Sequence, residues 1–302
     1  MKVPRTIAFG PKVDIPSWEW VGFDIARELS KYFTIILFEP DSGPIPQSDL
    51  VVFIKHKPHS EIWLNAKHRG IKMIYCPVDN YKNSRDIHRS RMFLRQCEAI
   101  LVHCERLLPA FKSYCRRVEF VEHHNRFGLR QMTDYKQDGY VVWVGFYHNL
   151  GPTIQWLQVH PLGMEIRFVT NFKTQAQRIL PINDEYKLLE WSPQAQYDQM
   201  SGAKAAFDIK GLSFNQINKP PVKAQQFISS GIPFATNGES YSAEYFDARG
   251  LQIPTPNDKH RWLSREYWGQ TQTVGSELRK RLTLENVGLH YQRIVNEILH
   301  IA

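Results

Sequence analysis

The chain has 302 residues, of which 42% are hydrophobic and 23% charged, values typical of a folded globular protein with room for two domains. No apolar run approaches the ~20 residues needed to cross a bilayer, and the apolar stretch after Thr6 is too short for a signal peptide. The net charge of +8 is uneven, since residues 1–135 carry 21 Lys and Arg against 15 Asp and Glu, and the later residues 17 against 15. We therefore expect a cytoplasmic protein, with peripheral attachment at the inner membrane face as an open alternative.

The first half of the chain alternates short apolar runs with helical patterns. Runs that predict strands lie at 6–9, 33–38, 50–54, 72–75, 99–103 and 118–121. Helices are expected between them, at 18–31, 60–69, 84–96 and 105–114. In the first of these helices Val21, Ile25, Leu29 and Phe33 recur every four residues, the spacing of one buried face. This alternation predicts right-handed crossovers and a largely parallel sheet.

Residues 124–139 break the rhythm because they are polar, aperiodic and contain two glycines, as a linker does. The rhythm then restarts, with strands expected at 140–144, 165–169, 186–189, 205–209, 233–235 and 251–253. Helices are expected at 153–159, 194–201, 222–230 and 243–247. We therefore predict an α/β protein with two Rossmann-like parallel-sheet domains, at 1–135 and 136–285, followed by a C-terminal helix at 286–302. The apolar stripe of that helix predicts packing, and consists of Val287, Tyr291, Ile294, Val295 and Ile298.

The positive excess of the first half is densest at 82–95. Arg85 and Arg89 are one helical turn apart, as are Arg91 and Arg95, so a helix over 84–96 would carry a basic face. Such a face is either a solvated surface or a site that attracts a lipid head group, an acidic glycan or nucleic acid. The cysteines lack Cys-x-x-Cys spacing, and we expect no metal site.

The most informative segment is 210–231, between an expected strand and a helix. Pro220 and Pro221 suit a first helical turn, which puts Asn218 or Lys219 at the cap. A helix N-terminus attracts phosphate through its free N–H groups and its dipole. Lys219 and Lys223 would be helical neighbours there, and two adjacent cations at that end favour a bound anion. The segment therefore predicts a phosphate site.

This segment and the following Gly-Ile-Pro-Phe-Ala-Thr of 231–236 resemble the donor-binding segment of GT-B-fold glycosyltransferases. The Lys-Pro-x-x-Lys pattern resembles a divergent bacterial branch of that fold. Many retaining members carry a Glu-x7-Glu motif, and here Asn218 and Gln226 stand at the two acidic positions, which departs from that subgroup. The resemblance implies an N-terminal acceptor domain, a nucleotide-sugar domain after it, and a C-terminal helix that crosses back to the first domain.

The resemblance also implies a set of donor-binding residues at strand ends. In the family, a strand and glycine loop like 141–149 lines the donor pyrophosphate, and later strand ends hold the nucleotide, with Gln226 on the ribose. The expected donor-binding residues are Gly145, Phe146, Asn149, Thr170, Asn171, Trp191, Ser192, Asn218, Lys219, Lys223 and Gln226.

The first domain is expected to bind the acceptor. Ser17-Trp-Glu-Trp20 places Glu19 between Trp18 and Trp20, an arrangement suited to a sugar ring. Asp79 follows the fourth expected strand, and the general base that an inverting enzyme needs is expected to be Asp79 or Glu19. A retaining enzyme needs no such base when the leaving phosphate takes the proton, and the sequence leaves both outcomes open. Arg85 and Arg89 are the expected contacts to an anionic acceptor such as a lipid-linked glycan, a polysaccharide or nucleic acid.

The chain lacks a Gly-x-Gly-x-x-Gly or Gly-x4-Gly-Lys motif, and it has no Asp-x-Asp signature. A cofactor or metal is therefore not implied, and Lys219, Lys223 and the helix end would neutralise the leaving diphosphate. The leading hypothesis is a hexose-type glycosyltransferase that uses a nucleotide-sugar as co-substrate. The alternatives are a sugar-nucleotide epimerase of the same fold and a non-catalytic basic module that binds a nucleotide or another anion.

Overall fold

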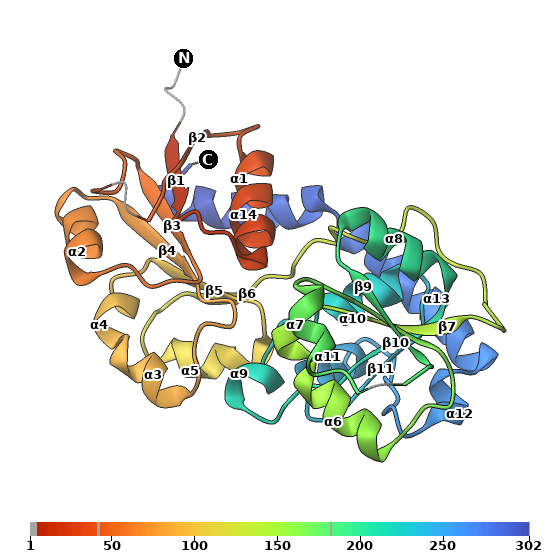
Figure 1. The fold of residues 1–302 in the computed structure, drawn as a ribbon. Coiled ribbons are helices and arrows are strands. Elements are labelled where there is room, and N and C mark those ends of the chain that lie inside the picture. The colour runs from red at the N-terminus through yellow and green to blue at the C-terminus, as the bar shows by residue number, and fades with distance from the viewer. Residues whose placement is uncertain (1–4, 41–42, 182, 302) are drawn as a thin grey trace. The chain divides into compact units, whose positions relative to one another are not determined.

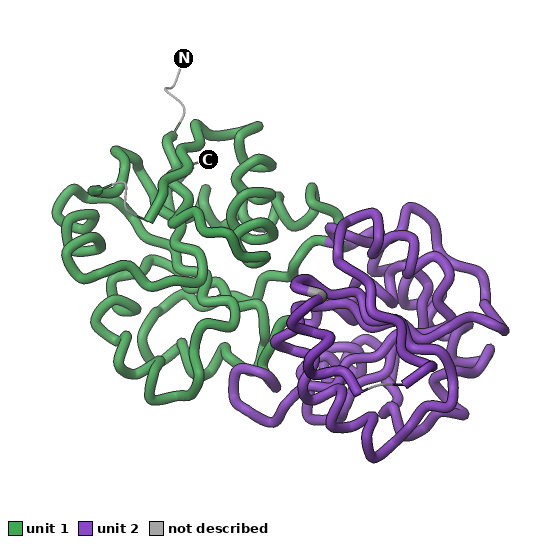
Figure 2. Tube along the Cα trace, viewed as in Figure 1, with its two compact units in different colours: residues 1–124, 218–220, 282–302 green, residues 125–217, 221–281 purple. Residues whose placement is uncertain are grey.

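The computed structural model describes residues 5–40, 43–181 and 183–301, and in these ranges the chain forms two parallel sheets (Figure 1). It divides into two compact units (Figure 2). Unit 1 consists of residues 1–124, 218–220 and 282–302, and unit 2 of residues 125–217 and 221–281. The chain therefore passes from one unit to the other four times.

Unit 1 contains a six-stranded sheet in the order β2-β1-β3-β4-β5-β6, and its paired strands are parallel. The strands are β1 (Thr6–Gly10), β2 (Thr34–Leu37), β3 (Leu50–Ile54), β4 (Lys72–Cys76), β5 (Ala99–Val102) and β6 (Val118–Phe120). Every residue of β3 and β5 is buried. A strand covered on both faces has an unbroken apolar sequence, which is why these runs were predictable.

The helices of unit 1 are shorter than the sequence predicts. They are η1 (Trp18–Phe23), α1 (Asp24–Leu29), α2 (Ser60–His68), α3 (Ser84–Arg89), α4 (Arg91–Leu94), η2 (Glu105–Leu107), α5 (Leu108–Lys112) and α14 (Leu284–Leu299). The expected helix at 18–31 begins with a π-helical segment, η1. The expected helix at 84–96 breaks at Ser90, so its four arginines do not share one helical face.

The C-terminal helix α14 packs on α1 in the core of unit 1 (Figure 1). Its predicted stripe lies in that core together with Ile25 and Leu29 of α1. Thr283 caps the helix by accepting a hydrogen bond from the backbone N–H of Asn286 at 3.1 Å. Burial of this amphipathic face accounts for the helix.

Unit 2 contains a five-stranded parallel sheet in the order β11-β10-β7-β8-β9. The strands are β7 (Tyr140–Val144), β8 (Ile166–Thr170), β9 (Tyr186–Glu190), β10 (Ala203–Asp208) and β11 (Phe234–Thr236). The strand expected at 251–253 is wrong, because this stretch joins no sheet although Leu251 and Ile253 are buried. A short apolar run indicates burial but not strand pairing.

The helices of unit 2 include a long one that the sequence analysis missed. They are η3 (Tyr147–Asn149), α6 (Gly151–Val159), α7 (Lys173–Gln177), α8 (Pro193–Gly202), α9 (Phe214–Ile217), α10 (Val222–Ser229), α11 (Tyr241–Asp247), α12 (Lys259–Trp262) and α13 (Arg265–Arg281). The missed helix α13 packs closely on α10, since a Cβ added to Gly275 would lie 2.1 Å from the carbonyl oxygen of Ile228. In the described ranges, no helix combines the length and the apolar character needed to span a bilayer.

The expected linker at 124–139 is packed against unit 2. The N–H of Leu129 donates to Oγ of Ser230 at 3.0 Å, and Nη1 of Arg279 donates to the carbonyl oxygen of Leu129 at 2.7 Å. These bonds satisfy backbone groups of an otherwise irregular segment. The segment therefore belongs to the unit that follows it from Asn125 onward.

Candidate functional site

In unit 2 the carboxyl ends of the strands gather several predicted donor residues along one edge of the sheet. In sheet order from β11 to β9, this edge carries Asn237, Asp208, Gly145, Thr170 and Trp191. Open parallel sheets bind their ligands beyond this edge. We call it the unit 2 carboxyl edge.

Asp208, the last residue of β10, is the buried anchor of this edge. Its carboxylate lies 2.5 Å from Nζ of Lys210 and 2.9 Å from Nζ of Lys223, and it accepts a hydrogen bond from Nε1 of Trp143 at 3.0 Å. Burial raises the pKa of Asp208, but the two lysines outweigh burial and lower this pKa to about 2. The carboxylate is therefore ionised at neutral pH, and together with the two lysines it leaves one net positive charge.

Lys223 lies directly beside Gly145. Its Nζ stands 4.3 Å from the centre of the Trp143 ring, in a cation–π arrangement. A Cβ added to Gly145 would lie 2.6 Å from that Nζ. The glycine therefore makes room for the lysine, while an approach of its backbone to phosphate stays a prediction.

The helix expected at 222–230 is confirmed, but the expected cap at Asn218 or Lys219 is wrong. The helix α10 begins at Val222, with Pro221 as its N-cap residue, so Lys219 precedes the helix and is not one turn from Lys223. Lys219 belongs with unit 1, and Lys223 already has Asp208 as a counter-ion. The premise of two adjacent cations that lack an anion therefore fails. Asp208 was not predicted as a site residue. The signal available in the sequence was its position as an acidic residue at the end of the strand before this segment.

A second polar cluster of unit 2 joins two predicted residues through one that was missed. Nε1 of Trp191 donates to Oε1 of Gln196 at 2.9 Å, and Nε2 of Gln196 donates to Oε1 of Gln226 at 3.4 Å. Gln226 is only 6% exposed, and among the described residues its Nε2 has no hydrogen-bond partner. A buried amide donor in this state costs about 1–3 kcal/mol, so a ligand acceptor beside it would be favoured.

The other predicted donor residues of unit 2 have varied roles. Ser192 caps α8, since its Oγ accepts the N–H of Ala195 at 3.0 Å. Thr170 is buried, and Oδ1 of Asn171 accepts the N–H of Tyr147 at 3.2 Å, which holds the loop after β7. Phe146 is exposed, and Asn149 ends η3.

In unit 1, Asp79 and Lys55 form an ion pair at the carboxyl edge of the sheet. Lys55 follows β3 and Asp79 follows β4, with 2.8 Å between Nζ and Oδ1 and side-chain exposures of 25% and 22%. Burial raises the pKa of Asp79, but Lys55 and then Lys219 outweigh burial and hold this pKa below its usual value. Asp79 is therefore a carboxylate at neutral pH. Lys55 is not among the site residues that the sequence predicts.

The backbone around this ion pair is strained. Lys55 has a φ of 59° and Val78, which precedes Asp79, a φ of 53°. The left-handed region is unfavourable for side chains with a Cβ, above all for a β-branched residue. Such strain costs about 1–3 kcal/mol per residue and is concentrated at functional sites.

His103, directly after β5, is a buried residue that the sequence analysis missed. Its Nδ1 lies 2.7 Å from the carbonyl oxygen of Val121 and so carries the proton, which leaves Nε2 as the acceptor. Among the described residues this Nε2 has no hydrogen-bond partner. Burial lowers the pKa of His103 to about 4, against an opposing effect of the Asp79 charge. A histidine that follows a fully buried strand was the signal available.

The segment around Glu19 differs from a sugar-binding surface. Trp18 is 2% exposed and lies in the core, where its ring packs against Gly22. Trp20 is partly buried against the same core, and Glu19 is partly buried in η1. The Trp18 ring is therefore not accessible to an acceptor.

The remaining predicted residues are Arg85, Arg89 and Asn218. Arg85 and Arg89 are exposed on α3, and Nη1 of Arg89 pairs with Oδ1 of Asp86 at 3.2 Å. Asn218 is buried in unit 1, with its Oδ1 3.9 Å from Sγ of Cys104.

The comparisons with known proteins support the fold. No known family's sequence model matches the chain, and no curated protein sequence matches it. HepE from Anabaena, solved with UDP and glucose, is 11% identical, with a TM-score of 0.64 over 97% of this chain and 100% of HepE. AviGT4, a glycosyltransferase involved in avilamycin A biosynthesis, is 10% identical, with a TM-score of 0.62 over 99% of both chains.

A third structure, of the GtfA/B complex, is 10% identical, with a TM-score of 0.57 over 83% of this chain. This chain spans only 57% of that larger one. The GT-B fold that the sequence resemblance predicts is thus confirmed: two parallel-sheet α/β units, matched by HepE over 97% and by AviGT4 over 99% of the chain.

Proposed function

We propose that this chain is a glycosyltransferase that moves a sugar from a nucleoside-diphosphate sugar to an acceptor hydroxyl. The observation that carries the proposal is the Asp208–Lys210–Lys223 cluster beside Gly145, on a GT-B sheet edge. HepE, which has the same fold, has been solved with UDP-glucose.

The cluster suits a diphosphate leaving group. A departing nucleoside diphosphate concentrates negative charge, and fixed cations aimed at that charge lower the barrier to transfer. Asp208 holds two lysines in place before any ligand arrives, and the net charge of the three groups is still positive. The first turn of α10 has no side-chain cap, so its N–H groups and dipole can add to this site.

The nucleoside would lie farther along the same sheet edge. Trp191 offers a partly exposed indole for stacking on a base, and the buried Nε2 of Gln226 offers a donor for a ribose oxygen. Asp79 in unit 1 would accept the proton of the acceptor hydroxyl in an inverting reaction, and the neutral His103 near it is a second acceptor.

The test is a panel of nucleoside diphosphates, read by melting temperature and then by calorimetry. At least one of them, with UDP first, should bind the wild-type chain. Lys223→Ala should weaken its binding tenfold or more, about 1.4 kcal/mol. Lys187→Ala is the matched control, because Lys187 is an exposed lysine of the same unit that pairs with Glu165. The proposal fails if no nucleotide binds or if Lys223→Ala binds it like the wild type.

A sugar-nucleotide epimerase is the second candidate, favoured by the electrostatic interaction between Asp79 and His103. Such enzymes use carboxylates and a histidine to break and re-form the same sugar–phosphate bond. Incubation with the donor alone separates the two functions, since an epimerase converts the sugar without an acceptor.

A further inference from the structure

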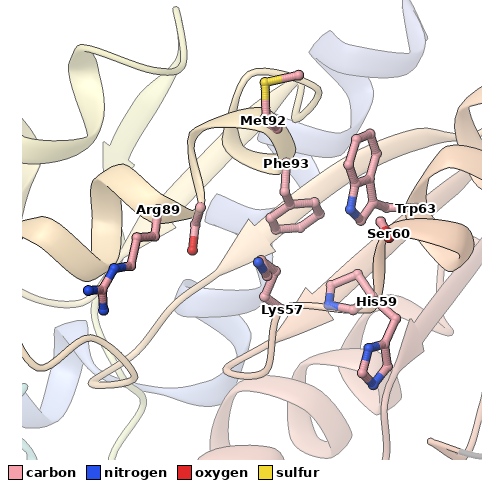
Figure 3. A pocket seen from close by; sticks show the side chains of 9 residues that line it. Lys57, His59, Ser60, Trp63, Arg89, Met92 and Phe93 are labelled. Atoms are coloured by element: carbon pink, nitrogen blue, oxygen red, sulfur yellow. The ribbon is translucent and has the colours of Figure 1, made fainter.

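A pocket of about 490 Å³ opens in unit 1 between the start of α2 and the α3–α4 turn (Figure 3). It is lined by Lys57, Pro58, His59, Ser60, Trp63, Arg89, Ser90, Met92 and Phe93. In Figure 3 the rings of Trp63 and Phe93 lie on one side, while Arg89 extends outward at the rim. The volume lies in the range of small-molecule sites.

The charges of this pocket have one sign. Lys57 and Arg89 are exposed and cationic, and none of the lining residues is acidic. Asp86 pairs with Arg89, whereas Lys57 has no ion pair among the described residues. The helix α2 starts here with His59 as an N-cap residue that makes no side-chain cap, so its positive dipole end adds to the field.

The apolar residues of the pocket place a second requirement on its ligand. Trp63 and Phe93 are buried, with ring centroids 6.2 Å apart, and Met92 is 58% exposed at the opening. A small inorganic anion would leave the exposed Met92 side chain uncovered. A ligand with an anionic group and a ring or apolar body satisfies both parts of the pocket.

The place of the pocket in the fold relates it to the carboxyl edge of unit 1. Lys57 lies two residues after Lys55, the partner of Asp79, and Arg89 lies in the connection from β4 to β5. A second basic pocket of unit 1, at the amino end of β4, differs because two of its lysines are occupied, Lys67 by Gln96 and Lys72 by the carbonyl oxygen of Ile298.

We propose that the Lys57–Arg89 pocket binds the phosphate-bearing end of the acceptor, with the body of that ligand on Met92. The word acceptor rests on the proposed transferase function, whereas binding of an organic phosphate does not. The phosphate can come from a soluble sugar phosphate or from a lipid, and both sources present the same group to Lys57 and Arg89.

Calorimetry of the full chain with glucose 6-phosphate, and with glucose as the uncharged comparison, tests the pocket. Co-sedimentation with phosphatidylcholine vesicles, with and without 20% phosphatidic acid, tests the lipid source. The phosphate form of one ligand should bind, and its uncharged counterpart should not. The double variant Lys57→Ala/Arg89→Ala should weaken this binding at least tenfold, and both changes lie on the surface, so the fold should be kept.

Lys112→Ala/Arg116→Ala is the charge-matched control, at two exposed cations at and just after the end of α5, and it should bind like the wild type. Lys223→Ala, in unit 2, should also keep the phosphate binding. Loss in the double variant supports the proposal for whichever source binds. Binding of neither ligand, or equal binding by the double variant, overturns it. UDP binding, measured on the same samples, tests the proposed transferase function separately. UDP can bind even if the Lys57–Arg89 pocket binds no phosphate, and the pocket can bind phosphate even if UDP does not bind.

Discussion

Each unit has an aspartate that pairs with lysine, but the two aspartates are buried to different extents. In unit 2, Asp208 is buried between two lysines and a tryptophan N–H, and its side chain is 2% exposed. In unit 1, Asp79 pairs with one lysine at 22% exposure, beside a strained backbone. A buried carboxylate surrounded by cations holds those cations in position, whereas a partly exposed carboxylate can contact a ligand. The difference predicts a supporting role for Asp208 and a direct role for Asp79.

The largest effect is expected from Asp208→Ala. It leaves Lys210 and Lys223 without their counter-ion in a buried site, which should lower the free energy of unfolding by about 3–5 kcal/mol in a urea titration. Glu165→Ala is the control, since Glu165 also bridges two cations, Arg167 and Lys187, but is 30% exposed. It should cost less than about 1 kcal/mol. Equal losses in the free energy of unfolding would show that burial does not distinguish these two carboxylates.

The next effect concerns His103 and pH. The unfolded histidine binds a proton near pH 6.5, but the folded one only near its pKa of about 4. The unfolded state therefore binds more protons in this window, and stability falls as the pH falls through it, by on the order of 3 kcal/mol for this group. His103→Gln should remove that part of the loss in urea titrations between pH 7 and pH 4. His68→Gln, at an exposed site, should follow the wild type, and an unchanged slope in His103→Gln would contradict the assignment.

A smaller effect separates two glycines on helix contacts. A Cβ at Gly275 in unit 2 meets the backbone oxygen of Ile228 at 2.1 Å, so Gly275→Ala should cost about 1–3 kcal/mol by overpacking. A Cβ at Gly288 in unit 1 meets Cγ of Glu28 at 2.4 Å, and a side-chain atom can shift more readily than a backbone oxygen. Gly288→Ala should therefore change the melting temperature less. The reverse order would show that α14 on α1 is the tighter contact.

The smallest effect on stability is expected from Asp79→Asn, about 1 kcal/mol, because the pair with Lys55 is partly solvated. Transfer activity should nevertheless fall by about 10²–10⁴-fold if the reaction is inverting, the usual contribution of a general base. Asp49→Asn is the matched control, an aspartate paired with Arg5 at the amino end of the same sheet. Full activity in Asp79→Asn would remove Asp79 from the chemistry.

The elements that the sequence predicted correctly are those with a clear local apolar pattern. The strands at 50–54 and 140–144 have the predicted bounds, since burial on both faces leaves nearly unbroken apolar runs. The helix α13 was missed because its buried residues are Tyr267, Thr271, Gly275 and Leu278. Their spacing is helical, but Thr and Gly carry no apolar signal.

The site was less predictable because its contacts join distant parts of the sequence. Lys223 was selected together with Lys219, as one of two adjacent cations near a helix start, and its partner Asp208 lies 15 residues away on β10. Sequence spacing does not reveal such a pair until β10 and α10 are placed together. His103 was missed for the same reason, since its bond to Val121 requires β5 and β6 side by side.

The four crossings of the chain limit how this protein can be divided. A fragment of residues 1–124 would lack α14 and expose the apolar side of α1 to water. A fragment of residues 125–281 would carry residues 218–220 away from Cys104, their neighbour in unit 1. Neither half is therefore a module that recombination could exchange as one continuous stretch of gene, and a chimera must bring residues 218–220 and 282–302 along with the first 124.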